Sequence, residues 1–269
     1  MSTYPTSSRT VPEAADGERR SGLARNLARV RTRIADACTA AGRDRGEVTL
    51  VAVTKTYPAS DVLHLASLGV HDIGENRDQD AAPKAVEVAA AGADVRWHFV
   101  GTLQRNKVRS VVGYAHMVHS VDSVRLARAL GAAAQRHRDR PLDVLVQVSI
   151  DGDPTRGGAV PAAGGARSGS VAGGADVEAD DRLLERVAET VANTPALRLR
   201  GLMAVAPLSW SATEAFARLA EIAAAFRARY PDATLLSAGM TADLEPAIAY
   251  GATHVRVGTA LLGERAPLR

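Results

Sequence analysis

Lys55 is the residue whose type and position suggest covalent chemistry. It follows the apolar run Val48–Val53, and strand alternation places Val51, Val53 and Lys55 on one face. We therefore expect Lys55 at the carboxyl end of a first strand, where parallel β/α folds carry their active sites. We expect the strands to enclose an apolar barrel, and an amine at its mouth would be desolvated. A neutral amine attacks carbonyl carbons to form a Schiff base. The alternative interpretation is a solvated loop lysine.

Lysine is rare in this chain. Of the 33 basic residues only Lys55, Lys84 and Lys107 are lysines, and the rest are arginines. Arginine stays protonated in proteins, whereas a buried lysine amine can lose its proton. This preference for arginine is consistent with lysine being kept where an amine is chemically required. It is equally consistent with codon usage that happens to leave three lysines.

Two later loops combine small and hydroxyl-bearing residues in a pattern that suits an anion. The residues concerned are Ser237, Gly239, Met240 and Thr241 in the first loop, and Gly258 and Thr259 in the second. Each loop follows a predicted strand and precedes a helical pattern, whose N-terminus binds anions through backbone N–H groups. Barrels of β/α units bind phosphate at the loops after their seventh and eighth strands. Ordinary connecting turns are the alternative.

Arg256 stands inside the predicted strand His254–Val257, where an unpaired charge is costly. It either pairs with an acid or contacts a ligand, and the sequence leaves both open. No metal site is predicted, because His116 and His119 point to opposite faces of a strand and the single cysteine excludes a Cys-based zinc site. We interpret His98 as a core residue rather than a catalyst.

Eight short apolar runs alternate with helical patterns from residue 48 onward. This alternation predicts the α/β class, and the simplest closed form is a (β/α)8 TIM barrel, with a doubly wound open sheet as the alternative. The predicted strands are Val48–Val53, Val70–Ile73, Val95–Val100, Met117–Val121, Val144–Ile150, Leu199–Val205, Thr234–Ser237 and His254–Val257. The predicted helices between them include Ala59–Leu68, Val124–Arg138, Asp181–Asn193 and Thr213–Tyr230.

Two segments lie outside this alternation. Residues 1–18 predict a disordered tail, followed by an extra amphipathic N-terminal helix that Gly42 ends, so that 19–269 form a single barrel domain. Residues 151–181 hold eight of the 23 glycines and predict a flexible insertion, with an ordered lid as the alternative.

The composition excludes several classes of protein. The formal charge is +3 over 269 residues, and aromatic residues make up only 4%, which argues against nucleic-acid binding. The basic excess lies in residues 1–45, which we interpret as a solvated arginine-rich helix. No apolar run spans a bilayer and no secretory signal is evident, so we expect a cytoplasmic protein that does not bind membranes.

Several spaced motifs together resemble the pyridoxal phosphate homeostasis proteins (the YggS/PROSC type). The resemblance runs from about residue 20 to 265, and that family is similar to the N-terminal barrel of alanine racemase, of fold-type III among pyridoxal phosphate (PLP) proteins. The motifs are Val-Ala-Val-Thr-Lys55-Thr, Gly74-Glu75-Asn76, Trp97-His98-Phe99-Val100-Gly101, Leu103-Gln104-Arg105-Asn106-Lys107, Gly201-Leu202-Met203, Ser237-Ala238-Gly239-Met240-Thr241 and Val255-Arg256-Val257-Gly258-Thr259.

The resemblance implies a role for each of these residues. Lys55 would form the Schiff base with PLP, and Arg256 would face the pyridine nitrogen. The PLP phosphate would lie against the two loops described above, with Met240, Thr241, Gly258 and Thr259. Asn76 would lie near the cofactor, and Lys107 would belong to a secondary PLP position. The family usually has Ser where this chain has Thr241, and the run after Gln147-Val148-Ser149 departs from the family pattern.

The same resemblance favours a carrier over an enzyme. A cation at the pyridine nitrogen disfavours its protonation and so weakens the ring as an electron sink, although racemases of this class also use arginine there. After about residue 265 only four residues remain for the domain that supplies a racemase with its second base. We therefore expect a monomeric PLP-binding homeostasis protein with no catalytic residues, and PLP-dependent apoenzymes as recipients. A single-domain racemase, a cofactor-free Schiff-base aldolase and a regulatory scaffold with an empty pocket are the alternatives.

Overall fold

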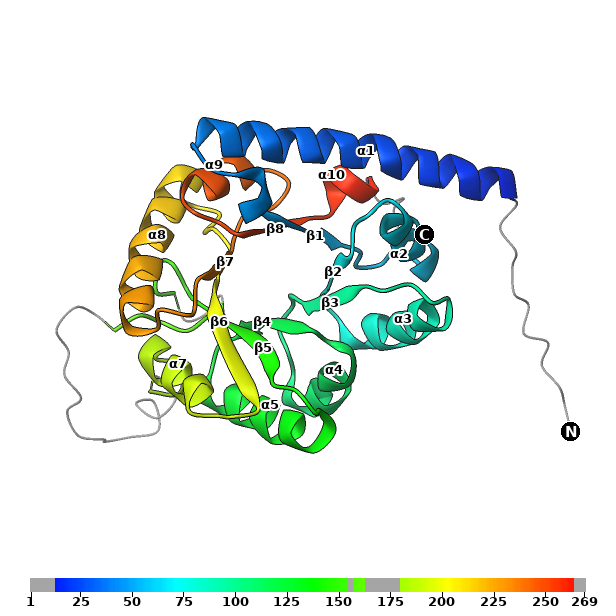
Figure 1. The fold of residues 1–269 in the computed structure, drawn as a ribbon. Coiled ribbons are helices and arrows are strands. Elements are labelled where there is room, and N and C mark those ends of the chain that lie inside the picture. The colour runs from blue at the N-terminus through cyan, green and yellow to red at the C-terminus, as the bar shows by residue number, and fades with distance from the viewer. Residues whose placement is uncertain (1–12, 154–156, 163–179, 264–269) are drawn as a thin grey trace, which may run out of the picture.

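Eight parallel strands close into a barrel in chain order, with β8 pairing back onto β1. The computed structural model describes residues 13–153, 157–162 and 180–263, and Figure 1 shows the strands surrounded by helices. The prediction of a (β/α)8 barrel is confirmed, and the open sheet is wrong. The strands are β1 (Thr49–Val53), β2 (Asp72–Glu75), β3 (Arg96–Phe99), β4 (Met117–Val121), β5 (Leu142–Gln147), β6 (Leu197–Met203), β7 (Leu235–Ser237) and β8 (His254–Val257).

All eight predicted strands are present, but some boundaries differ. The second begins at Asp72 instead of Val70, because the N–H of Val70 donates to the carbonyl of Leu65 and closes the preceding helix. The fifth and sixth strands end at Gln147 and Met203, earlier than the apolar runs that predicted them. Val148 and Ile150 are buried nonetheless, because they pack beyond the end of the strand.

Helices cover the outside of the barrel. They are α1 (Glu13–Ala40), α2 (Ala59–Ser67), α3 (Asp78–Ala90), α4 (Val108–Tyr114), α5 (Val124–His137), α7 (Leu184–Ala192), α8 (Ala212–Arg229), α9 (Leu244–Ala249) and α10 (Thr259–Leu262). Two short 3-10 turns, Arg45–Glu47 and Arg105–Lys107, complete the described elements. The four predicted helices agree with α2, α5, α7 and α8 to within three residues at each end.

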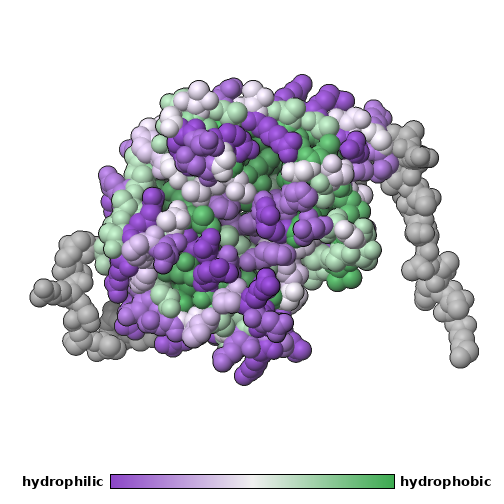
Figure 2. All heavy atoms as spheres, viewed as in Figure 1, coloured by the Kyte–Doolittle hydropathy of each residue, from purple (hydrophilic) through white to green (hydrophobic). Residues whose placement is uncertain are grey.

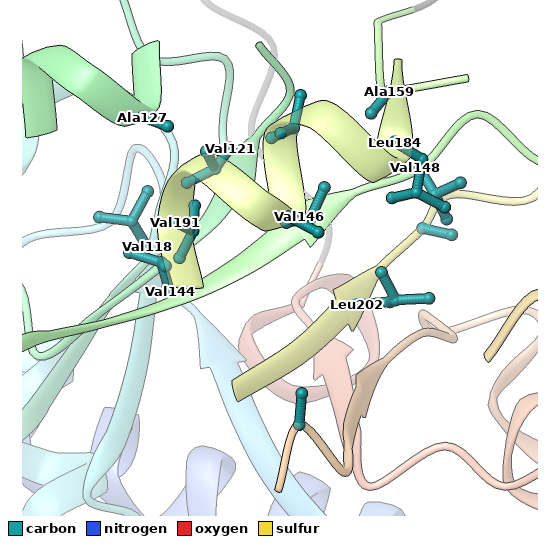
Figure 3. Close-up of a cluster of buried hydrophobic side chains, with 14 of the residues drawn as sticks. Val118, Val121, Ala127, Val144, Val146, Val148, Ala159, Leu184, Val191 and Leu202 are labelled. Atoms are coloured by element: carbon teal, nitrogen blue, oxygen red, sulfur yellow. The ribbon is translucent and has the colours of Figure 1, made fainter. Parts of the chain in front are cut away.

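The apolar core lies between the strands and the helices. Outward-facing strand residues such as Val118, Val144 and Val146 pack against α5 and α7, as Figure 3 shows, and all three are fully buried. Alternation along each strand therefore sends one set of side chains to this core and leaves the other set for the barrel interior.

The barrel interior is unusually polar. Barrels of this kind are filled mainly by branched apolar side chains. Here Met117, Leu145 and Met203 form a small apolar cluster, while three histidines from β3, β4 and β8 lie with ring centroids 5.0–6.3 Å apart. The expectation that the strands enclose an apolar barrel is wrong.

The N-terminal helix is longer than predicted and does more than add a solvated face. It begins at Glu13, so residues 13–18 are helical rather than part of a tail, since this stretch holds alanines and early acidic residues that favour a helix start. Residues 1–12 lie outside the described part of the chain. The predicted apolar face is confirmed, because Leu23, Leu27, Val30 and Ile34 are buried.

Polar side chains of α1 hydrogen-bond to the last helices of the barrel. Helix α1 lies beside these helices, α9 and α10, in Figure 1. Arg19 pairs with Asp61 and donates to the carbonyl of Leu262, and Asn26 donates to that of Leu261. These carbonyls end α10 and lack partners within the helix. The interpretation of a solvated arginine-rich face is therefore wrong for Arg19 and for Arg33, whose contacts are described below.

Only the ends of the glycine-rich insertion are described. Ala159 is fully buried and bridges to Val148, and Val160 bridges to Leu183, so residues 157–162 pack against the end of β5. The prediction of flexibility for 154–156 and 163–179 falls outside the described residues. Among the described helices, none combines the length and the apolarity that crossing a membrane requires. Hydrophilic and hydrophobic residues are interspersed over the face that Figure 2 shows.

Candidate functional site

A cavity of about 650 Å³ opens at the carboxyl ends of the strands. Seven of the nine residues singled out from the sequence line it: Lys55, Asn76, Met240, Thr241, Arg256, Gly258 and Thr259. The other two, Ser237 and Gly239, support the wall from behind. Ser237 is fully buried beneath Arg256, and Gly239 shapes the loop between β7 and α9. The fold thus brings residues from positions 55 to 259 to one mouth.

Lys55 stands in a tight turn two residues after the end of β1. The N–H of Tyr57 donates to the carbonyl of Thr54 at 3.0 Å, and Thr56 has a φ of 68°, which a threonine adopts only at an energetic cost. The side chain of Lys55 is exposed in the cavity. The expectation that the protein alone desolvates this amine is wrong, because the mouth is open and the interior below it is polar.

A buried ion pair holds the two strand ends that carry Lys55 and Asn76. Lys84 of α3 lies 2.6 Å from Glu75 and also donates to the carbonyl of Thr54 at 3.0 Å. The hydroxyl of Thr54 donates to the same Glu75 oxygen at 2.6 Å. Val53 and Gly74 are in register, so these contacts fix the β1 and β2 ends at one height.

Gly101 completes this side of the cavity. A Cβ atom at this position would lie 2.2 Å from the carbonyl oxygen of Asn76, closer than real atoms approach. Only glycine therefore lets the end of β3 pass so close to Asn76.

Arg256 forms the floor of the cavity. It is 5% exposed, donates to the hydroxyl of Ser237 at 2.7 Å and to the carbonyl of Ala204 at 2.9 Å, and reaches the cavity wall. Burial lowers the pKa of its guanidinium to about 10, partly opposed by the charge of Asp243. Within residues 13–153, 157–162 and 180–263, no acid forms an ion pair with Arg256, so the ligand-contacting alternative is the one that the geometry favours.

The two loops of small residues line the same cavity as Lys55. In the first, Gly239 has a φ of +87°, and a Cβ there would lie 2.5 Å from that of Ala247, so the turn requires glycine. In the second, Gly258 precedes Thr259 at the start of α10, where backbone N–H groups lack helical partners. Thr241 links the loops, because its hydroxyl accepts from the N–H of Ala260 at 3.4 Å.

Helix α1 supports the first of these loops from outside. Arg33 pairs with Glu245 at 2.7 Å and donates to the carbonyl of Thr241 at 2.9 Å. The N-terminal helix therefore braces a cavity wall although none of its residues lines the cavity.

Curated relatives of nearly equal length carry one name. The chain is 42% identical over 259 residues to the pyridoxal phosphate homeostasis protein of Mycobacterium leprae, which covers 92% of this chain and 94% of the relative. It is 37% identical over 248 residues to the protein of the same name from Escherichia coli K12, with 90% and 97% covered.

The chain belongs to the pyridoxal phosphate homeostasis protein family.

Further comparisons agree with this family. The model of the alanine racemase N-terminal domain matches residues 23–266. A solved structure of PipY from Synechococcus elongatus with PLP bound is 31% identical and has a TM-score of 0.67, with 90% of this chain and all of that chain covered. The resemblance that the motifs indicated is confirmed, and so is the alanine racemase type of barrel.

Other cavity residues were not predicted from the sequence. Tyr57, Val100, Val205, Ala242 and Gly263 also line the wall. Val100 belongs to a motif shared with the family, so that motif was a usable signal. Val205 is half exposed although it ends an apolar run, and that exposure is visible only in the structure.

The remaining chemistry-bearing residues lie apart from the mouth. Lys107 borders a second cavity of about 260 Å³, and Asn76 borders both cavities. His98 is buried and hydrogen-bonded, which confirms its interpretation as a core residue. In the described part of the chain, no three His, Cys, Asp or Glu residues gather in a way that would hold a metal ion.

Proposed function

We propose that this protein holds PLP through a Schiff base to Lys55 and takes part in PLP homeostasis as a carrier rather than as a catalyst. The family name of its relatives and the PLP bound to PipY support this function. The seven cavity-lining site residues then contact the cofactor, Ser237 and Gly239 support them from behind, and none of the nine is assigned a catalytic role.

The observation that carries the proposal is the unpaired cation of Arg256 in the wall that also presents Lys55. PLP has an aldehyde, a pyridine nitrogen and a phosphate, and the cavity offers each a partner. The amine of Lys55 suits the aldehyde, the guanidinium of Arg256 suits a ring nitrogen that accepts a hydrogen bond, and the hydroxyls of Thr241 and Thr259 suit the phosphate.

Two features favour a carrier. PLP supplies an electron-withdrawing ring when bound, and the charge of Arg256 opposes protonation of the ring nitrogen, which weakens that withdrawal. Tyr57 lies on the cavity wall, but its hydroxyl donates to the carbonyl of Gly263 at 2.8 Å. It is therefore held away from the role of a second base.

The first experiment locates the covalent bond. We expect added PLP to give the purified protein a visible absorption band, and borohydride reduction followed by peptide mapping to place the adduct on Lys55. Lys55→Ala abolishes the band, whereas Lys107→Ala retains it. An adduct on Lys107, or a Lys55→Ala protein as yellow as the parent, contradicts the proposal.

The second experiment separates carrier from enzyme. We expect incubation of the PLP-loaded protein with L- or D-alanine to give no racemisation at ordinary enzyme rates. Rapid racemisation would establish the single-domain racemase. A colourless protein that cleaves or forms carbon–carbon bonds would establish the aldolase, and a failure to bind PLP would leave the scaffold. The cytoplasmic location, the monomeric state and the apoenzyme recipients stay predictions.

A further inference from the structure

A chain of hydrogen bonds crosses the barrel interior and ends at Arg256. Its members are Asp72, His98, His119, Ser237 and Arg256, from five different strands. The nitrogen–oxygen distance from His98 to Asp72 is 2.9 Å, and the two imidazoles lie 2.8 Å apart. His119 lies 2.9 Å from the hydroxyl oxygen of Ser237, which accepts from Arg256 at 2.7 Å. Strands β4 and β7 are separated by β5 and β6 (Figure 1), so the chain spans the interior.

The far end of the chain is a charged pair at the opposite mouth of the barrel. Asp72 accepts two hydrogen bonds from Arg96, whose side chain is 58% exposed. Burial acts to raise the pKa of Asp72, but the hydrogen bonds from His98 and Arg96 outweigh it and lower the pKa well below the ordinary value. Asp72 is therefore an acceptor only.

The hydrogen bonds run in one direction when each of the two imidazoles carries a single N–H. Nε2 of His98 then donates to Asp72, and Nδ1 of His98 accepts. Burial lowers the pKa of His119 well below its ordinary value, so His119 has one N–H. Its Nε2 donates to His98, and its Nδ1 accepts from the hydroxyl of Ser237.

The consequence for Ser237 is that its only proton is used on His119. Its oxygen lone pairs then face the guanidinium of Arg256. A hydroxyl that donates its own proton to another group is a stronger acceptor. A serine hydroxyl without this restraint could rotate and present its proton toward the cation. The chain of hydrogen bonds thus fixes an acceptor that faces Arg256, which is the place that a carboxylate takes in an ion pair.

We propose that Asp72, His98 and His119 are positioning residues that hold Arg256 toward the pyridine nitrogen of PLP through Ser237. None of the three lines the cofactor cavity. This inference rests on the proposed function, and it assigns the polar interior of the barrel a role in setting the electronic state and the retention of the bound cofactor.

His254 provides a matched control. It comes from β8 and is also buried, at 9% exposure against 4% for His98 and 0% for His119. Its ring centroid lies 6.2 Å from that of His98 and 6.3 Å from that of His119. Its Nδ1 lies 2.9 Å from the hydroxyl of Thr253, so His254 shares the interior without belonging to the chain of hydrogen bonds.

The test compares the PLP absorption spectrum and PLP dissociation constant of three variants with those of the parent. We expect His98→Leu to shift the absorption maximum and to weaken PLP binding about tenfold. His98→Gln, which retains one donor and one acceptor, restores most of the parent behaviour, and His254→Leu leaves the spectrum unchanged. Equal shifts in His98→Leu and His254→Leu, or no shift in His98→Leu, would overturn the inference.

A second measurement is made on the parent protein, so its result does not depend on whether a variant folds. Nitrogen-15 NMR of the histidine-labelled parent reports which ring nitrogen carries the proton, with assignments from single substitutions. We expect Nε2–H at both His98 and His119, and a proton on Nδ1 of His119 would refute the inference. A parent protein that forms no adduct on Lys55 defeats the proposed function and this inference together, whereas an adduct with the wrong tautomer defeats this inference alone.

Discussion

The two sides of the barrel mouth are built with different chemistry around a buried cation. On the β1–β2 side, Lys84 is 7% exposed and its charge is met by the carboxylate of Glu75. On the β7–β8 side, Arg256 is 5% exposed and donates to a hydroxyl and a carbonyl. A cation that is neutralised by a carboxylate serves the fold, whereas one held by neutral acceptors retains its charge.

The largest expected effect comes from removing the buried cation on the β1–β2 side. Lys84→Met leaves Glu75 buried without its cation, which costs about 3–5 kcal/mol in the free energy of unfolding. Urea denaturation at neutral pH measures this loss.

Arg256→Met is the matched comparison for this prediction. It leaves two neutral acceptors unpaired, so it should cost less stability, about 1–3 kcal/mol, while impairing PLP binding more severely than its stability loss suggests. A larger stability loss in Arg256→Met than in Lys84→Met would reverse the comparison.

The next effect concerns acid, to which the β8 side is the more sensitive. Burial lowers the pKa of His254 to about 4 from its ordinary 6.5, and the negative charge of Asp72 only partly opposes this. The unfolded chain therefore takes up a proton first as the pH falls from 6.5 toward 4, and stability is lost over this window, by about 3 kcal/mol at pH 4.

Denaturation of the parent and of His254→Leu at pH 7 and pH 4 checks this effect. The variant should lose less stability between the two values than the parent. The same acid sensitivity in both proteins would show that His254 does not contribute.

The third effect concerns a hydroxyl on the β7–β8 side that we propose contacts the PLP phosphate. Thr259→Ala removes one hydroxyl from the cavity wall and should weaken PLP retention by about 1–3 kcal/mol. Equilibrium dialysis of PLP measures the change. Unchanged retention would indicate that backbone N–H groups alone hold the phosphate.

The smallest effect concerns the contacts that Arg33 of α1 makes with the loop between β7 and α9 from outside the barrel. The Arg33–Glu245 pair is partly exposed, at 35% and 44% for the two side chains. Surface pairs of this kind contribute under about 1 kcal/mol, so Arg33→Ala should lower the free energy of unfolding only slightly. Thermal unfolding beside Lys84→Met checks this, and similar losses in the two variants would mean that α1 carries more of the cavity wall than its contacts indicate.

Much of the fold was predictable because its signals are local. Alternating apolar runs identified all eight strands, and the spacing of Leu23, Leu27, Val30 and Ile34 identified the apolar face of α1. The boundary errors at Val70 and after Gln147 arise because burial continues beyond the last ladder hydrogen bond. Seven cavity residues were predictable for a similar reason, since each lies within four residues of the carboxyl end of a strand and parallel strands bring those ends together.

The unpredicted features depend on contacts between residues far apart in the chain. Lys84 was one of three noticeable lysines, but its pairing with Glu75 requires α3 to fold back over β2. The interior was expected to be apolar, because His119 and Ser237 are 118 positions apart in the sequence and only barrel closure brings them together.

By itself, the sequence determined the alternation of strands and helices, the family and most of the residues at the mouth, because strand periodicity and short motifs are properties of neighbouring residues. The tertiary structure alone decided which buried cation is neutralised by a carboxylate and which is held by neutral acceptors, and it decided that Lys55 stays exposed. The physical reason is that charge pairing and desolvation depend on distances across the barrel, which no local pattern specifies.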